Sequence, residues 1–263
     1  MDALMKGGIP FHMKDAIPNL FAHWISLDII AYLRLVSGTG NTRANWLRIM
    51  NRPNRYIKRE ALAPFTSDIS VAQLKAYYQD KDWMLERLDR LEYDLSIMKR
   101  MSPYAAIHYL SNAMKYQDYL KDYAKEHHIN EQELLDVLNA VHESSQSCRT
   151  FAEWFTYIDT YTEELQKQAK SPASKDANNE SGVCLCTLHC AKGLEYPIVF
   201  IPDINEDNIP HARAAVDADL EEERRLFYVG ITRAKEHLHL YCVGEASGKE
   251  KFPSRFLEEL NEM

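Results

Sequence analysis

The chain has 263 residues, enough for one large or two small domains whose core needs no disulfide or metal. A hydrophobic fraction of 46% and a charged fraction of 27% exclude global disorder, collagen-like repeats and a disulfide scaffold. No run approaches the roughly 18 apolar residues of a membrane span, and the first ten residues lack the features of a secretion signal. The 5 cysteines include no C-x-x-C pair, so we expect a cytoplasmic protein with free thiols and no membrane partner.

A formal net charge of -8 excludes a protein that coats DNA through bulk positive charge. One basic cluster nevertheless falls within a short stretch of sequence. It consists of Arg48, Arg52, Arg55, Lys58 and Arg59. These cations could follow a phosphate backbone, or they could belong to a solvated loop with no specific partner, and the second interpretation is favoured.

The segment from Phe21 to Met50 has the periodicity of a helix. Ile25, Ile29 and Leu33 recur at the spacing of one helical face, and the pattern breaks at residues 37–40, where two glycines occur. We therefore predict a helix, a turn and a second helix.

Beyond Pro53 the pattern stays helical for more than a hundred residues. Two apolar stripes at helical spacing indicate core positions rather than cofactor contacts. They are Met84, Leu88, Leu91, Leu95 and Met98, and Trp154, Ile158, Tyr161 and Leu165. Helix starts are predicted after Asn130 and after Thr150, where a capping side chain precedes the periodic residues. A helix boundary is predicted at Ser102-Pro103, because the residue before a proline avoids the helical conformation.

Composition changes between Gln168 and Gly182, a polar stretch that is typical of a linker. Short apolar runs follow at 183–188, 198–201 and 238–243, with a helix predicted from Asp219, as an N-terminal cap, to Ala234. The order strand, helix, strand predicts an α/β layer whose parallel strands are buried on both faces.

The usual signals of catalytic chemistry are missing from the sequence. It contains no phosphate-loop motif, and residues 38–40 lack the third glycine of a dinucleotide fingerprint. Cys184, Cys186, His189 and Cys190 lie close together, but their spacing is not that of a zinc site. Strand alternation also places the first two opposite His189. No metal site is expected.

Two segments carry a much more specific signal. Residues 187–195 read TLHCAKGLE, and residues 221–234 read EEERRLFYVGITRA. They resemble motifs V and VI of the UvrD/Rep/PcrA group of superfamily 1 DNA helicases. Residues 8–11 and 28–35 are similar to the family segment that follows motif IV. The resemblance covers 1–52 and 180–263 well, and 53–179 only in length and helical character.

The resemblance implies a RecA-like parallel-sheet domain interrupted by an all-helical insertion. Residues 1–52 and 180–263 would form the second RecA-like domain of a helicase, and 53–179 would be its 2B-like insertion, ending in the linker. The first RecA-like domain, with the phosphate loop and the Mg-binding acids, would be missing, so ATP and Mg would need that domain. The intact protein would move 3′ to 5′ on single-stranded DNA or a tailed duplex, and this fragment alone would be inactive.

Five residues match positions with family roles. Arg233 matches the arginine finger, since phosphoryl transfer needs a positive charge that does not titrate; by itself it could be a cation at a helix end. Glu195 matches the acid that binds the ATP ribose, and Gly193 lets the backbone turn beside the nucleotide. Thr187 and His189 match positions that touch the DNA strand. Outside the motifs, Glu195 could be a surface acid and His189 a loop residue.

Two departures from the family pattern bear on these roles. Cys190 replaces the usual serine. Arg55-Tyr56-Ile57-Lys58 stands where many relatives have R-G-I-G in a duplex-contacting hairpin, and Tyr56 and Lys58 are expected not to copy the glycine geometry. The competing hypothesis is a non-catalytic interaction or regulatory module with a helicase fold. Glu195 and Arg233 favour the helicase, because a retired ATPase needs neither.

Overall fold

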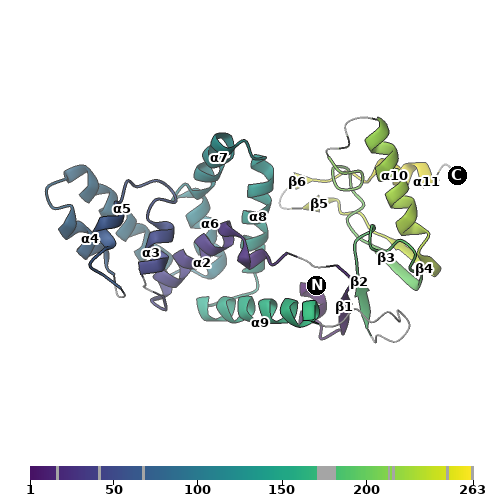
Figure 1. Cartoon of the computed structure of the whole chain (residues 1–263), viewed down its shortest axis with the longest axis horizontal. Coiled ribbons are helices and arrows are strands. Elements are labelled where there is room, and N and C mark those ends of the chain that lie inside the picture. Colours follow the sequence, from purple (N-terminus) through teal and green to yellow (C-terminus); the bar gives the residue numbers. More distant parts are fainter. Residues whose placement is uncertain are drawn as a thin grey trace. The chain divides into compact units, whose positions relative to one another are not determined.

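The computed structural model describes residues 1–15, 18–40, 43–66, 69–170, 182–212, 214, 217–246 and 249–261. The chain is a mixed α/β protein that divides into two compact units (Figure 1). The helical unit is Pro18–Leu165, and the sheet unit combines Met1–Ile17 with Gln166–Met263.

Among the described residues of the helical unit, every regular element is a helix. Two of its elements are short 3-10 helices, η1 (Leu20–Ala22) and η2 (Arg59–Leu62). Its α-helices are α2 (Trp24–Ser37), α3 (Arg43–Ile49), α4 (Val71–Tyr77), α5 (Asp82–Met98), α6 (Pro103–Asn112), α7 (Tyr116–His127), α8 (Glu131–Ser144) and α9 (Phe151–Lys170), whose last turn belongs to the sheet unit.

Most helix predictions for this unit are confirmed. The predicted break after α2 is Gly38, which has the left-handed φ of 75° that ends a helix. Pro103 is the first residue of α6, and Ser102 caps it by accepting a hydrogen bond from the Ala105 amide. Asn130 caps α8 in the same way.

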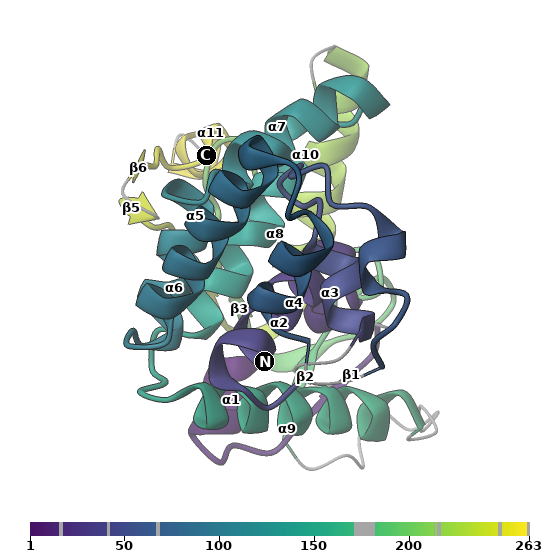
Figure 2. The same ribbon diagram turned by 90° about the vertical axis from the view of Figure 1, so that its left-hand side faces the viewer.

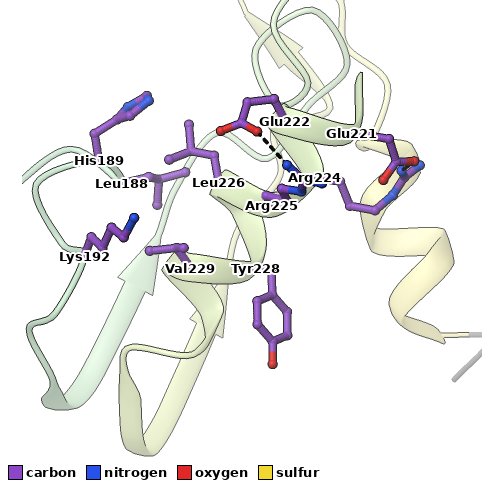
Figure 3. A pocket seen from close by; sticks show the side chains of 10 residues that line it. All are labelled: Leu188, His189, Lys192, Glu221, Glu222, Arg224, Arg225, Leu226, Tyr228 and Val229. Atoms are coloured by element: carbon purple, nitrogen blue, oxygen red, sulfur yellow. Dashed lines mark hydrogen bonds and ion pairs between the residues drawn. The ribbon is translucent and has the colours of Figure 1, made fainter. Parts of the chain in front are cut away.

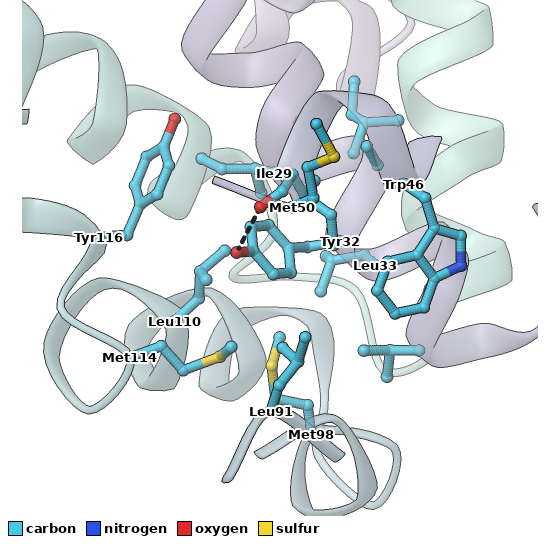
Figure 4. Close-up of a cluster of buried hydrophobic side chains, with 14 of the residues drawn as sticks. Ile29, Tyr32, Leu33, Trp46, Met50, Leu91, Met98, Leu110, Met114 and Tyr116 are labelled. Atoms are coloured by element: carbon cyan, nitrogen blue, oxygen red, sulfur yellow. Dashed lines mark hydrogen bonds between the residues drawn. The ribbon is translucent and has the colours of Figure 1, made fainter. Parts of the chain in front are cut away.

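The helical core forms around α2, which packs against α3, α5, α6 and α8 (Figure 2). The predicted stripe of α5 faces this core, with Met84, Leu88, Leu91 and Met98 all buried. Figure 4 shows side chains from these helices meeting in one cluster. They include Ile29, Tyr32 and Leu33 of α2, Trp46 of α3, Leu91 of α5 and Leu110 of α6. The amphipathic pattern in the sequence therefore identifies the core correctly.

A carboxylate lies inside this apolar core. The side chain of Asp28 on α2 is fully buried. It accepts hydrogen bonds from Arg52 at 2.8 Å, from Arg48 at 3.2 Å and from the Tyr116 hydroxyl at 2.9 Å. Burial raises the pKa of Asp28, and the positive charge of Arg52 opposes this effect. Three donors thus join α2 to α3, to the loop after α3 and to α7.

The basic cluster at 48–59 is therefore neither a simple solvated loop nor a continuous phosphate strip. Arg48 and Arg52 pair with the buried Asp28. Arg55 donates to the carbonyls of Ile49 and Pro53 at 3.1 and 3.2 Å, and its guanidinium lies over the ring of Tyr32. These three cations hold the fold together, because a buried acid and unpaired carbonyls need donors.

The sheet unit is built from short strands and a connecting helix. β1 (Phe11–Met13) pairs in parallel with β2 (Val183–Leu185), and β3 (Tyr196–Ile201) pairs in parallel with β4 (Ala234–Leu240). α10 (Asp217–Ile231) connects β3 to β4, which confirms the predicted order. The remaining elements are α1 (Asp2–Lys6), β5 (Glu245–Ala246), β6 (Lys249–Glu250) and α11 (Arg255–Asn261).

Three details of the sheet unit differ from the sequence predictions. α10 begins at Asp217, so Asp219 lies inside the helix and is not its cap. β4 begins at Ala234 and ends at Leu240, earlier than the predicted run, because its pairing with β3 starts at Tyr196. α9 continues to Lys170 into the predicted linker, and residues 171–181 of that linker lie outside the described residues.

The predicted burial of the strands on both faces is wrong for β3 and β4. Val199, Ile201 and Leu240 pack toward the core that Phe227 of α10 and Phe256 of α11 complete. The opposite face leaves Ile198, Phe200 and Tyr241 exposed, with Phe200 at 58%. Within the described residues, helices of this unit pack on only one face of the strand pair.

The units also divide at other places than the expected boundaries of 52/53 and 179/180. The first boundary lies between Ile17 and Pro18, because α2 and α3 pack into the helical core rather than against the strands. The second lies within α9, after Leu165. As for the membrane, no helix in the described ranges is both long and apolar enough to cross one.

The first prediction concerns Tyr116. Tyr116→Phe should lower the free energy of unfolding of the helical unit by about 1–2 kcal/mol, because it removes a buried hydrogen bond to a carboxylate while both arginines remain. Chemical denaturation followed by tryptophan fluorescence measures the change. The control is Tyr93→Phe, at a tyrosine that is 63% exposed on α5. Equal stability of the two variants would contradict a structural role for the Tyr116 hydroxyl.

Candidate functional site

The two motif segments meet in the sheet unit. Residues 187–195 form a loop between β2 and β3, and residues 221–231 belong to α10. A pocket of about 670 Å³ lies between them, and Figure 3 shows the side chains that line it. The loop contributes Leu188, His189 and Lys192, and α10 contributes Glu221, Glu222, Arg224, Arg225, Leu226, Tyr228 and Val229. Segments far apart in sequence thus form one concave surface.

Two glycines shape this surface. Gly193 has a φ of 84°, which side chains rarely adopt, and it turns the loop toward β3. Gly230 lets the Leu188 side chain approach α10 closely, since a Cβ there would come within 2.5 Å of it. The loop is further held by hydrogen bonds from the amides of Ala191 and Cys190 to Thr187.

A carboxylate from the other end of the sequence also fixes the loop. Asp15 accepts a hydrogen bond from the Thr187 amide at 2.6 Å, and a second from the Cys190 thiol. These bonds, the thiol first, lower the pKa of Asp15. The sequence analysis missed Asp15, because no local pattern marks a contact between residues 172 positions apart.

Arg233, the predicted arginine finger, stands just after α10 and is half-buried. Its guanidinium donates to the carbonyl of Val229 at 2.8 Å, to the carbonyl of Leu194 at 3.0 Å and to the hydroxyl of Thr232 at 2.9 Å. It therefore connects the end of α10 to the motif loop, immediately beside Gly193.

Glu195, the predicted ribose ligand, lies next to this contact. The amide of Tyr196 donates to the Arg233 carbonyl at 2.9 Å, and Tyr196 pairs with Ala234, so Glu195 and Arg233 each lie just before one of two paired strands. The Glu195 carboxylate is exposed and forms an ion pair with Lys235 at 3.2 Å. An exposed pair of this kind contributes little to stability, so the carboxylate is available to a ligand.

The predicted DNA contacts, Thr187 and His189, are both exposed on the loop. His189 lines the pocket with Lys192. Thr187 lies outside the pocket lining, at the contact with Asp15. The structure therefore groups the five predicted residues on one loop and the adjoining strand starts, with His189 toward α10 and with Glu195 and Arg233 at the other end of the loop.

Arg224 and Arg225 form ion pairs with acids one turn earlier in α10. Arg224 pairs with Glu221, and Arg225 pairs with Glu222 at 3.3 Å. Arg224 also binds Glu259 through two hydrogen bonds, at 2.8 and 3.0 Å, and joins α10 to α11. The side chain of Arg225 stays largely exposed.

Neighbouring groups affect the thiols near the loop. Burial raises the pKa of Cys186 to about 11, so its thiol stays protonated at neutral pH. The Cys184 sulfur forms a hydrogen bond with the Tyr196 hydroxyl at 3.2 Å. In the part of the chain that the structure describes, no group of three or more His, Cys, Asp or Glu side chains is placed to hold a metal ion.

Comparison with known proteins gives consistent matches. The family model of the UvrD-like helicase C-terminal domain matches residues 1–244. ATP-dependent DNA helicase PcrA of Bacillus subtilis is 31% identical over 91% of this chain and 34% of its own length. ATP-dependent DNA helicase Rep of Buchnera aphidicola is 28% identical over 98% of this chain and 42% of its own length. YjcD of Bacillus subtilis is 28% identical over 98% of this chain and 34% of its own length. The chain thus spans well under half of each relative.

The second prediction concerns Asp15. Asp15→Ala should speed hydrogen exchange at the Thr187 amide by roughly fivefold at pH 7, as expected for the loss of one hydrogen bond. Because the pKa of Asp15 is lowered in the fold, its contribution is complete above the ordinary value of about 4. It should disappear as the pH falls through the folded value. The Ile204 amide, which donates to Tyr241, is the internal control. An unchanged exchange rate at the Thr187 amide would show that Asp15 does not stabilise the loop.

Proposed function

Since this chain belongs to the family of UvrD-like helicase C-terminal domains, we propose that it forms the second motor domain of an ATP-dependent DNA helicase. The arrangement of Arg233 and Glu195 just before neighbouring strand starts, with Gly193 two residues before Glu195 on the loop, carries this proposal. The cation would face a phosphate of a bound nucleotide, and the acid would face its ribose.

In this proposal the sheet unit is the RecA-like domain and the helical unit is its insertion. The pairing of β3 with β4 in parallel across α10 supports the first assignment, because such a unit presents its loops at one edge of the sheet. The separate core around α2 supports the second assignment. The sequence has no phosphate-loop motif. The first RecA-like domain of the helicase would therefore supply the phosphate loop and the Mg-binding acids.

Arg233 would act on the γ-phosphate of ATP. Its guanidinium is oriented by the Val229 carbonyl and the Thr232 hydroxyl. The third bond, to the Leu194 carbonyl, would be exchanged for phosphate oxygens when the two motor domains close. A phosphate oxygen is charged and competes well with a neutral carbonyl for the same donor. Glu195 would leave Lys235 and accept hydrogen bonds from the ribose hydroxyls.

Thr187 and His189 would contact the phosphates and sugars of single-stranded DNA, in a substrate that is a single strand or a tailed duplex. His189 shares its pocket with α10, the helix that ends next to Arg233. A movement of Arg233 on ATP binding would therefore reach the DNA contact through α10 and the loop. This short connection would couple hydrolysis to movement along the strand, 3′ to 5′.

One observation favours the alternative, a regulatory or interaction module without catalysis. Three donor groups of Arg233 are satisfied inside the sheet unit, by Val229, Leu194 and Thr232. An arginine with a purely structural role would form the same set of hydrogen bonds. The two functions differ in what removal of the guanidinium does to turnover.

The third prediction separates these functions. In a protein that joins this chain to its phosphate-loop domain, Arg233→Ala should lower ATP turnover by on the order of a thousandfold, with a smaller effect on ATP binding. Arg100→Ala, at an exposed arginine just after α5 and outside both motifs, is the control and should retain turnover. Steady-state ATPase assays measure both. Normal turnover in Arg233→Ala would assign the residue a structural role.

The fourth prediction concerns the 263-residue chain by itself. It should show no DNA-stimulated ATPase activity, because its sequence contains no phosphate-loop motif to hold the β- and γ-phosphates. Phosphate release is measured with and without oligo(dT). Turnover that co-purifies with the chain and disappears in Arg233→Ala would contradict the proposal that a second domain is needed.

A further inference from the structure

An exposed aromatic cluster lies on the helical unit. It consists of Tyr56, Trp83 and Arg87, and we call it the Tyr56 cluster. The Arg87 guanidinium lies 4.9 Å from the centre of the Tyr56 ring and 5.2 Å from that of Trp83. Tyr56 is 59% exposed and Trp83 is 50% exposed. Two large aromatic side chains thus offer much of their surface to solvent.

The loop that carries Tyr56 is held firmly. Asn51 accepts hydrogen bonds from the amides of Arg55 and Ile57, at 3.2 and 2.9 Å. The hydroxyl of Tyr78 accepts from the Lys58 amide at 2.7 Å. The side chain of Ile57 is buried, so the residue after Tyr56 anchors the loop in the core. The position of the Tyr56 ring is therefore set by the fold.

The backbone of Tyr56 is strained at this position. Its φ is 60°, in the left-handed region that glycine adopts freely and that other residues, especially bulky ones, avoid. Tyr56 thus has a φ that glycine adopts freely, and the surrounding hydrogen bonds hold it there. Glycine would serve the fold better. A strained, exposed aromatic residue on a rigid loop therefore points to a use for the ring itself.

We propose that the Tyr56 cluster stacks on an unpaired base of single-stranded DNA. The inference rests on the proposed function, since it assumes that the chain works on DNA. Aromatic rings and a flat guanidinium are the groups on which bases stack in single-strand-binding proteins. Lys58 and Arg59, both exposed, follow Tyr56 in the chain and can meet the phosphates of the same strand.

The charges near the cluster favour stacking over phosphate attraction as the source of affinity. Asp82 and Glu86 flank Trp83 and Arg87 in the sequence of α5, so the surface is not strongly positive. Affinity that comes from the rings depends on the presence of a base and only weakly on salt. Both properties can be measured.

Tyr56→Gly separates the use of the ring from its structural effect. The substitution removes the ring and relieves the left-handed φ, so the thermal midpoint should be unchanged or higher. Affinity of the 263-residue chain for oligo(dT) should nevertheless fall by roughly tenfold, as for the loss of one stacked base. Trp83→Ala should have a similar effect on affinity. Tyr93→Ala, at an exposed tyrosine of the same helix, is the matched control and should bind normally.

An abasic oligonucleotide of the same length tests whether the base matters. Wild-type chain and Tyr56→Gly should bind it equally, at low and at high salt. Normal oligo(dT) binding by Tyr56→Gly, or an equal loss of affinity for both oligonucleotides, would overturn the inference. The inference would also be overturned if Tyr56→Gly weakened the binding of a blunt duplex only, because the cluster would then contact paired DNA.

The variant Thr187→Ala shows whether a negative result contradicts only the base-stacking inference or also the proposed function. If Thr187→Ala weakens oligo(dT) binding and Tyr56→Gly does not, the proposed function stands and the Tyr56 cluster is not a base site. If the wild-type chain binds no DNA at any salt concentration, both proposals fail together.

Discussion

The helical unit depends on one buried carboxylate. Asp28 accepts hydrogen bonds from Arg48, Arg52 and Tyr116, and Tyr116 is 88 residues away in the sequence. A buried acid without these donors would be strongly unfavourable, so α2, α3 and α7 are held in the one arrangement that provides them. Arg52 also begins the loop that presents Tyr56. The surface on which we propose that a base stacks is therefore positioned by a charge pair in the core.

In the sheet unit, charged side chains likewise hold the motif loop in place through hydrogen bonds. Asp15 holds one end of the loop through Thr187, and Arg233 holds the other end through the Leu194 carbonyl. Both charged side chains act on backbone groups, whereas His189 and Lys192 remain exposed between the two contacts and Glu195 is exposed just beyond the second. A loop that is fixed at both ends and open in the middle presents its exposed side chains at defined positions. This is the geometry that the proposed nucleotide and DNA contacts need.

Several arginines in the two units stabilise the fold and are not free to bind a phosphate backbone. Arg48, Arg52 and Arg55 satisfy a buried acid and backbone carbonyls, and Arg224 joins α10 to α11. Arginine suits this work because its planar guanidinium donates several hydrogen bonds at once. Affinity for DNA is thus expected from a few exposed groups on fixed loops rather than from a charged strip, in keeping with the net charge of -8.

The sequence by itself determined the helix periodicity, the α/β order of the C-terminal part and the two motifs, because each of these is written in residues close together along the chain. It identified Gly193, Glu195 and Arg233 as a candidate site, and their proximity follows from the pairing of β3 with β4. Only the tertiary structure decided the contact of Asp15 with Thr187 and the exposure of one face of β3 and β4. The left-handed φ of Tyr56 was also decided there, against its local preference. The physical reason is the same in each case: burial and hydrogen bonding between distant segments set these features, and no local period or propensity encodes them.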